Sequence, residues 1–125
     1  MKYKEINRSN IEVLVKDFYS RVLLDKSISD FFISNLGSDM KSDLWKNHIK
    51  TLSDFWYKIT LGEGSYRGNP FAEHLKLEGL KVQSFQSWLF LFFLSVDSIY
   101  SKDIALLFKE KSTMIAGNFM KNLGL

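Results

Sequence analysis

The chain is poor in the residue types that build disulfides and metal clusters. It has no cysteine, one proline and two histidines among its 125 residues. The lack of cysteine excludes disulfides and thiol chemistry, and two histidines do not supply the four ligands of a tetrahedral zinc site. The first residues contain no apolar signal core, so we expect no export and a cytoplasmic protein.

Long hydrophobic runs and clustered charges are also missing. Residues 82–96 carry no charge, but a membrane span needs about 20 mainly apolar residues, so we expect a buried central helix there. The net charge of +3 is spread along the chain and forms no basic stripe of the kind that contacts nucleic acid. We therefore expect a protein that binds neither membrane nor nucleic acid. We also expect a monomer. Phosphate-binding glycine motifs and a nucleophile elbow are absent.

Aromatic residues are abundant instead, with eleven Phe, five Tyr and three Trp. Apolar residues at helical spacing predict four long helices, at 9–24, 42–61, 81–100 and 102–122, and two short ones, at 28–33 and 70–77. The expected helix ends are a capping box of Ser9 and Glu12, a stop at Gly62 and an N-cap at Ser101. The core faces are expected to include Leu44, Trp45, His48, Leu52, Phe55, Trp56 and Ile59 in the second long helix and Leu106, Leu107, Met114, Ile115 and Phe119 in the last. The pattern is that of one all-α domain spanning residues 1–125.

The two histidines carry the main chemical signal. His48 lies on the apolar stripe of its helix, and His74 follows a glycine-rich loop. A single histidine on an apolar face is more often a core residue than a metal ligand. Tyr19 and Trp88 also lie on otherwise apolar stretches and carry an O–H and an N–H that can donate to a ligand. One ligating histidine together with such donors is the set that a globin-type haem protein needs.

Four stretches resemble the truncated haemoglobins, and specifically the third group, known from ε-proteobacteria. Phe18-Tyr19, residues 45–48 with Phe55-Trp56, residues 61–75 and residues 88–92 match this family, and together they cover essentially the whole chain. The loop with His74 is the most specific of them. The chain also lacks the glycine pair that the first two groups carry between their first helices, as the third group does.

The resemblance implies a two-over-two helical sandwich around haem b. It implies that His74 is the proximal iron ligand, that Tyr19 and Trp88 donate hydrogen bonds to the bound ligand, and that His48 faces the distal side, either bonding the ligand or gating its access. The other residues expected to contact haem are Phe32, Leu52, Phe55, Trp56 and Tyr66.

Two functions remain open at this point. The first is a haem protein that binds oxygen, nitric oxide or other diatomic molecules at a five-coordinate iron. It would handle oxygen, or remove nitric oxide or reactive oxygen by oxygen-dependent nitric oxide oxidation or peroxidase-like chemistry with an unidentified reductase. The second is a helical binding or regulatory module without a cofactor, in which the apolar stretch 88–94 is plain core.

Overall fold

The computed structural model describes residues 2–64, 66 and 79–125. Within these ranges the chain is helical and has no strand, apart from one isolated bridge between Tyr3 and Tyr100. The helices are α1 (Arg8–Leu24), α2 (Ser29–Leu36), α3 (Asp43–Leu61), α5 (Val82–Ile99) and α6 (Lys102–Asn122). The all-α prediction is confirmed, while the short helix expected at 70–77 lies outside the described residues.

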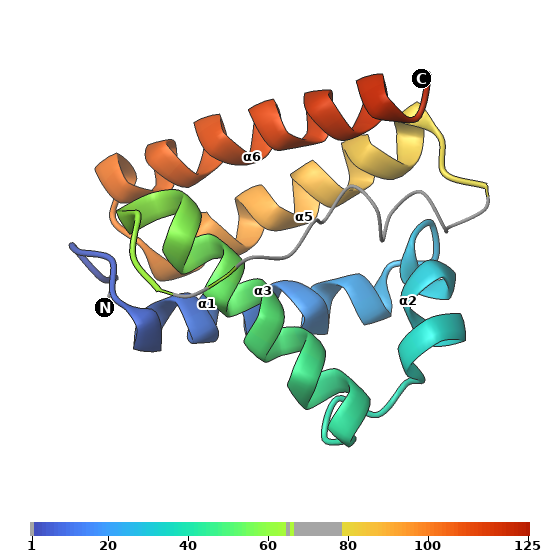
Figure 1. The fold of residues 1–125 in the computed structure, drawn as a ribbon, viewed down its shortest axis with the longest axis horizontal. Coiled ribbons are helices and arrows are strands. Elements are labelled where there is room, and N and C mark those ends of the chain that lie inside the picture. The colour runs from blue at the N-terminus through green and yellow to red at the C-terminus, as the bar shows by residue number, and fades with distance from the viewer. Residues whose placement is uncertain (1, 65, 67–78) are drawn as a thin grey trace.

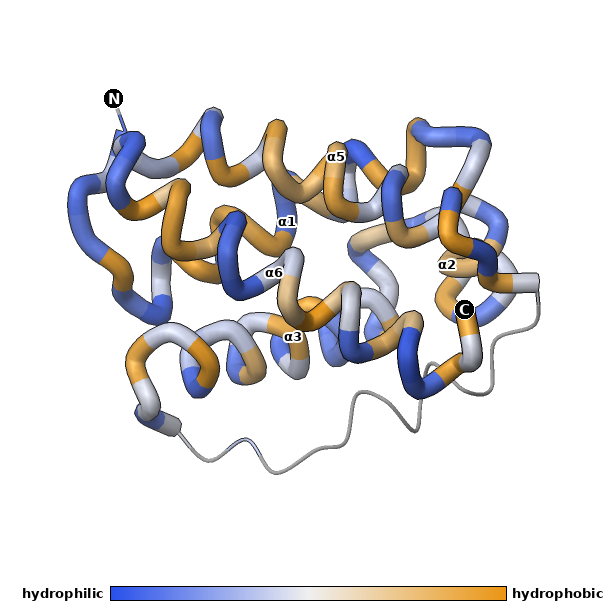
Figure 2. Tube along the Cα trace, turned by 90° about the horizontal axis from the view of Figure 1, so that it is seen from above, coloured by the Kyte–Doolittle hydropathy of each residue, from blue (hydrophilic) through white to orange (hydrophobic). Residues whose placement is uncertain are grey.

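The helices form two stacked pairs (Figure 1). α5 and α6 run side by side in opposite directions, and α3 packs across α1. α1 also packs against α5 and so joins the two pairs, while α2 packs on the end of α1. Figure 2 shows the same helices from above, with apolar and polar residues alternating along each of them.

The corner between α5 and α6 is short and firmly held. Tyr100 and Ser101 alone separate the two helices. The N-terminal segment closes this corner, because the Tyr3 N–H donates to the Ile99 carbonyl (2.9 Å) and the Ser101 N–H donates to the Tyr3 carbonyl (2.8 Å). The N-terminus is therefore tied to the far end of α5.

The start of α1 differs from the capping box expected at Ser9 and Glu12. The N-cap is Asn7, whose side chain accepts the Asn10 N–H (2.8 Å), and the Asn10 side chain accepts the Asn7 N–H (3.0 Å). Asn10 is buried, and it also accepts the Tyr100 hydroxyl (2.7 Å). This network uses the amide of Asn10, which a search for Ser and Glu does not detect, and it starts the helix earlier.

Helix ends were predicted better than helix faces. Gly62 ends α3 in a left-handed conformation (φ 69°) and Ser101 is the N-cap of α6, both as expected. The helix expected from residue 42 begins one residue later, with Ser42 as its N-cap. In α6, however, the expected core residues Leu106 and Met114 are 55% and 60% exposed. Small residues lie in the interface instead, and the buried positions of α6 are Ala105, Phe108, Ser112, Ala116 and Phe119.

Two further predictions of burial are wrong. Leu44, expected on the core stripe of α3, is 59% exposed, while its neighbour Trp45 is fully buried. In α5, Phe90 and Leu94 are exposed, because α1 and α6 cover only part of the helix circumference. None of the described helices has the length and hydropathy to cross a bilayer.

Candidate functional site

Tyr19 lies at the centre of an aromatic cluster built from three helices. It projects from α1 and is 3% exposed. Its ring contacts Trp45 and His48 of α3 at centroid distances of 5.2 and 5.0 Å, and Phe32 of α2 at 5.4 Å. The three helices therefore hold the phenol in one orientation.

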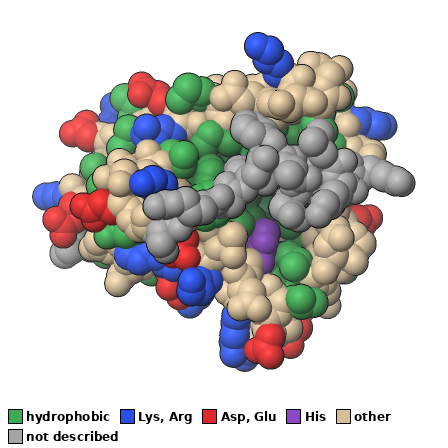
Figure 3. All heavy atoms as spheres, in the orientation of Figure 1, with side chains coloured by type: hydrophobic (Ala, Val, Ile, Leu, Met, Phe, Trp, Pro, Cys, Tyr) green, Lys and Arg blue, Asp and Glu red, His purple; other side chains and the backbone are tan. Residues whose placement is uncertain are grey.

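The polar tip of Tyr19 is directed at His48. The Tyr19 hydroxyl and His48 Nε2 share a hydrogen bond of 2.9 Å. Burial raises the pKa of the Tyr19 phenol above its usual value, because desolvation disfavours the phenolate. The hydroxyl thus keeps its proton at neutral pH. His48 is half-buried, and in the space-filling view the histidine of the described residues reaches the surface beside hydrophobic side chains (Figure 3).

Trp88 projects from α5 into the same region. Its ring lies edge-on to Phe18, with centroids 5.6 Å apart, and Phe18 in turn contacts Tyr19 at 4.9 Å. The indole N–H makes no hydrogen bond to any residue that the structure describes. The indole is half-buried beside apolar side chains, so its N–H is available to donate to a bound ligand.

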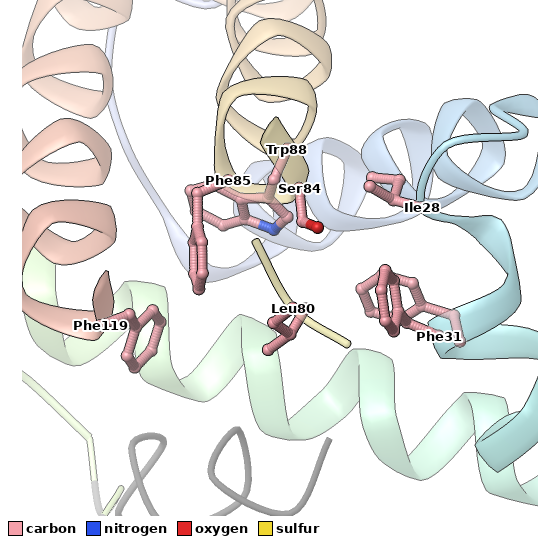
Figure 4. Close-up of a pocket in the computed structure, with 8 residues that line it drawn as sticks. Ile28, Phe31, Leu80, Ser84, Phe85, Trp88 and Phe119 are labelled. Atoms are coloured by element: carbon pink, nitrogen blue, oxygen red, sulfur yellow. The ribbon is translucent and has the colours of Figure 1, made fainter. Parts of the chain in front are cut away.

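Trp88 lines a small apolar hollow (Figure 4). The hollow encloses about 40 Å³, which is room for a water or a diatomic molecule. Figure 4 shows side chains that converge on it from α2, from the start of α5 and from the end of α6. They are Ile28, Phe31, Phe32, Leu80, Ser84, Phe85, Trp88 and Phe119.

A second hollow of about 300 Å³ lies between α3 and α6. Phe55 and Ile59 line it from α3, and α6 contributes Lys111, Met114, Ile115, Asn118 and Phe119. Phe119 lines both hollows, so the two spaces adjoin. The volume of the larger hollow is at the lower limit for ordinary cofactor pockets. Its walls are mostly apolar, as a flat apolar macrocycle requires.

The remaining residues expected at the haem lie around these spaces in different ways. Tyr66 contacts Phe55 edge-on at 5.5 Å. Leu52 is half-buried, one turn after His48, and packs against the main core. Trp56 lines neither hollow and stacks instead on Phe92, with centroids 4.9 Å apart. His74 lies outside the described residues.

The sequence analysis missed several residues of the two hollows. Phe85 precedes Trp88 by three positions, so helical spacing places both on one face of α5, and this signal was present in the sequence. Phe31 is adjacent to Phe32 in the short helix expected at 28–33, but it was not predicted as a pocket residue. Lys111 and Asn118 were not expected on the inner face of α6, and their position next to α3 follows only from the tertiary structure.

The comparisons with known proteins agree on one relative. No family model matches the chain. A protein named group 3 truncated hemoglobin ctb, from Campylobacter jejuni, is 32% identical over 123 residues, which is 98% of this chain and 95% of the relative. A crystal structure titled group III truncated hemoglobin from Campylobacter jejuni superposes with a TM-score of 0.90 and 34% identity, covering 98% of this chain and 95% of the other.

Identity of this extent, together with a matching fold, confirms the two-over-two helical sandwich expected from the resemblance. The chain belongs to the group 3 truncated haemoglobins.

Proposed function

We propose that the chain binds haem b through His74 and binds oxygen or a related diatomic molecule on the side of Tyr19 and Trp88. Haem supplies an iron with an open coordination position for such a ligand. The observation that supports the proposal best is the combination of the buried Tyr19 hydroxyl with the Trp88 N–H, which lies beside an apolar hollow and has no partner among the described residues. Both groups are donors, and a bound oxygen molecule with partial negative charge is an acceptor.

The described residues suit haem in two respects. The walls of both hollows are mostly rings and aliphatic side chains, with Phe32 beside one and Phe55 beside the other. A few polar groups among apolar walls is the usual composition of a cofactor pocket. Tyr66 contacts Phe55, and we assign it to the haem pocket as well.

His48 has a different role from that of the two donors in this proposal. It reaches the surface and holds the Tyr19 hydroxyl. Movement of its side chain would open a path from solvent and release the phenol at the same time. We therefore assign His48 to ligand access and to positioning of Tyr19, and Tyr19 and Trp88 to the ligand itself.

Strong hydrogen bonds to bound oxygen slow its release. Each charge-assisted bond contributes about 1.5–3 kcal/mol. Two such donors therefore favour chemistry on the bound molecule over delivery to another site. We propose oxygen-dependent nitric oxide oxidation or the reduction of peroxides as the class of reaction, with electrons from a separate donor.

The experiment is a titration of the purified chain with haemin, followed by its absorption in the Soret region. The proposal predicts saturation at one haem per chain and a ferrous, ligand-free spectrum of a five-coordinate iron that changes on adding oxygen or carbon monoxide. A chain that stays colourless after reconstitution, while remaining folded by circular dichroism, is instead the cofactor-free helical module.

A further inference from the structure

A continuous series of aromatic rings leads from the hollow beside Trp88 to the surface of the protein. Each ring contacts the next, and the series crosses the core from α5 to the N-terminal segment. Its members in order are Trp88, Phe92, Trp56, Phe108, Tyr100 and Tyr3.

The inner half is a stack of nearly parallel rings. Trp88 and Phe92 lie one turn apart on α5, with centroids 5.4 Å apart and planes inclined by 4°. Trp56 of α3 stacks on the other side of Phe92 at 4.9 Å and 16°. Two indoles are thus separated by a single phenyl ring.

The outer half continues from Trp56 to solvent. Phe108 of α6 lies 5.7 Å from Trp56, and Tyr100 stacks on Phe108 at 4.9 Å. Tyr3 lies 6.1 Å from Tyr100 and is 43% exposed. The two backbone hydrogen bonds of Tyr3 fix the end of the series at the α5–α6 corner.

The residue types in this series are suited to electron transfer. Indole and phenol rings lose one electron more readily than other side chains, and transfer is fast only over short distances. The Tyr100 hydroxyl donates to Asn10 Oδ1 (2.7 Å), and an amide oxygen is too weak a base to take the phenolic proton. Tyr3 reaches solvent, so water accepts its proton. The phenoxyl radical is therefore retained at Tyr3 and not at Tyr100.

We propose that this series carries electrons from Tyr3 to the haem pocket during the reduction of peroxide, which makes Tyr3 the reaction site for a small one-electron donor of the phenol or ascorbate class. The proposal rests on the proposed haem binding. Reduction of one hydrogen peroxide to two waters consumes two electrons and two protons. For each electron, Tyr3 becomes a phenoxyl radical and releases its proton to water. One donor molecule then restores Tyr3 with one electron and one proton, so two donors are consumed per peroxide.

The test locates the radical in the haem-loaded, full-length protein. Hydrogen peroxide is added with a nitroso spin trap, and mass spectrometry of the digest identifies the trapped residues. Tyr57 is the internal control, because it reaches solvent and bonds the Glu63 carboxylate (2.8 Å) but has no ring contact among the described residues. We expect the adduct at Tyr3 in clear excess over Tyr57. Equal labelling, or labelling at Tyr57 alone, would overturn the proposal.

Two variants give the second line of the test. Trp56→Phe keeps a ring in the series and removes an oxidisable station, so the Tyr3 adduct per haem should fall to the level of Tyr57. Tyr3→Phe should slow oxidation of a phenol donor, whereas Tyr57→Phe should not. An unchanged Tyr3 adduct in Trp56→Phe, or equal donor oxidation in the two tyrosine variants, contradicts the electron path.

Haem content is measured first by the pyridine haemochrome method for every sample. A wild-type chain without haem overturns both the proposed function and this inference. A haem-loaded chain that reacts with peroxide without labelling Tyr3 overturns only the electron path.

Discussion

The Tyr19 hydroxyl lies 2.9 Å from Nε2 of His48, and this contact connects α1 to α3 at the edge of the candidate pocket. The hydroxyl has one proton and can donate it to one acceptor at a time. With that proton retained by burial, Tyr19 is available either to His48 or to a bound ligand. The same contact therefore affects both the access of a ligand to the pocket and the hydrogen bond that stabilises the bound ligand.

Tyr19→Phe keeps the ring in its cluster and removes the donor. Loss of a bond worth about 1.5–3 kcal/mol should speed oxygen dissociation from the ferrous protein by roughly ten- to a hundredfold. Carbon monoxide, with less charge on its outer atom, should dissociate at nearly the wild-type rate. Stopped-flow kinetics measures both rates, with Tyr57→Phe as the control tyrosine. Equal acceleration of both ligands would indicate a general opening of the pocket instead.

Trp88→Phe should also speed oxygen dissociation. Its indole N–H has no other partner among the described residues, so the effect reports a bond to the ligand. If Tyr19 and Trp88 donate to the same oxygen atom, their effects on oxygen binding are coupled. The stabilisation energy of bound oxygen lost in the double variant should then be smaller than the sum of the energies lost in the two single variants. If the logarithms of the oxygen dissociation rates change additively, the two donors act on separate atoms. If oxygen dissociates at the wild-type rate in both single variants, the donor mechanism is wrong.

The buried phenol of Tyr19 should make the haem-free chain sensitive to alkali. Its pKa is raised above the ordinary value of about 10, so the folded chain holds a proton that the unfolded chain releases. The stability is fully present below about pH 10 and is lost as the pH rises above it. Between about pH 10 and 11, the free energy of unfolding of wild type should fall more steeply than that of Tyr19→Phe, by up to about 1.4 kcal/mol per pH unit. Parallel curves from denaturant titrations would show that Tyr19 is accessible to water.

Ser95 offers a test of core packing that is independent of haem. Among the described residues, its Oγ is the buried side-chain polar atom without a hydrogen bond. Ser95→Ala should raise the free energy of unfolding by about 1 kcal/mol, because it removes an unsatisfied group. Ser53 is the matched control, since it is equally buried but donates to the Ile49 carbonyl (2.7 Å). A loss of stability in Ser95→Ala would mean that its hydroxyl has a partner in solution.

Local signals in the sequence predicted most of the helix boundaries. The stop at Gly62 and the N-cap at Ser101 depend on a few neighbouring residues, and both are present. The faces of the helices depend on distant residues. Ala105 and Ala116 allow α6 to approach α5 closely, and this displaces Leu106 to the surface in spite of its hydrophobicity.

The candidate site depends still more on long-range structure. Tyr19 and His48 are 29 positions apart, and no spacing rule brings them together. The resemblance implied that both residues lie on the distal side, but it did not predict the hydrogen bond between them. The hollow between α3 and α6 was not predicted at all, because Lys111 and Asn118 look like ordinary surface residues in the sequence.

The central claim is that His74 binds the haem iron while His48 does not. The most direct measurement is haemin titration of His74→Ala beside His48→Ala, with the Soret band and haem occupancy recorded for each. We predict that His74→Ala loses haem or binds it weakly, since it removes the iron–nitrogen bond. His48→Ala should keep one haem per chain and a five-coordinate ferrous spectrum. Full occupancy with an unchanged spectrum in His74→Ala, or a six-coordinate low-spin ferrous spectrum in ligand-free wild type, would contradict the account.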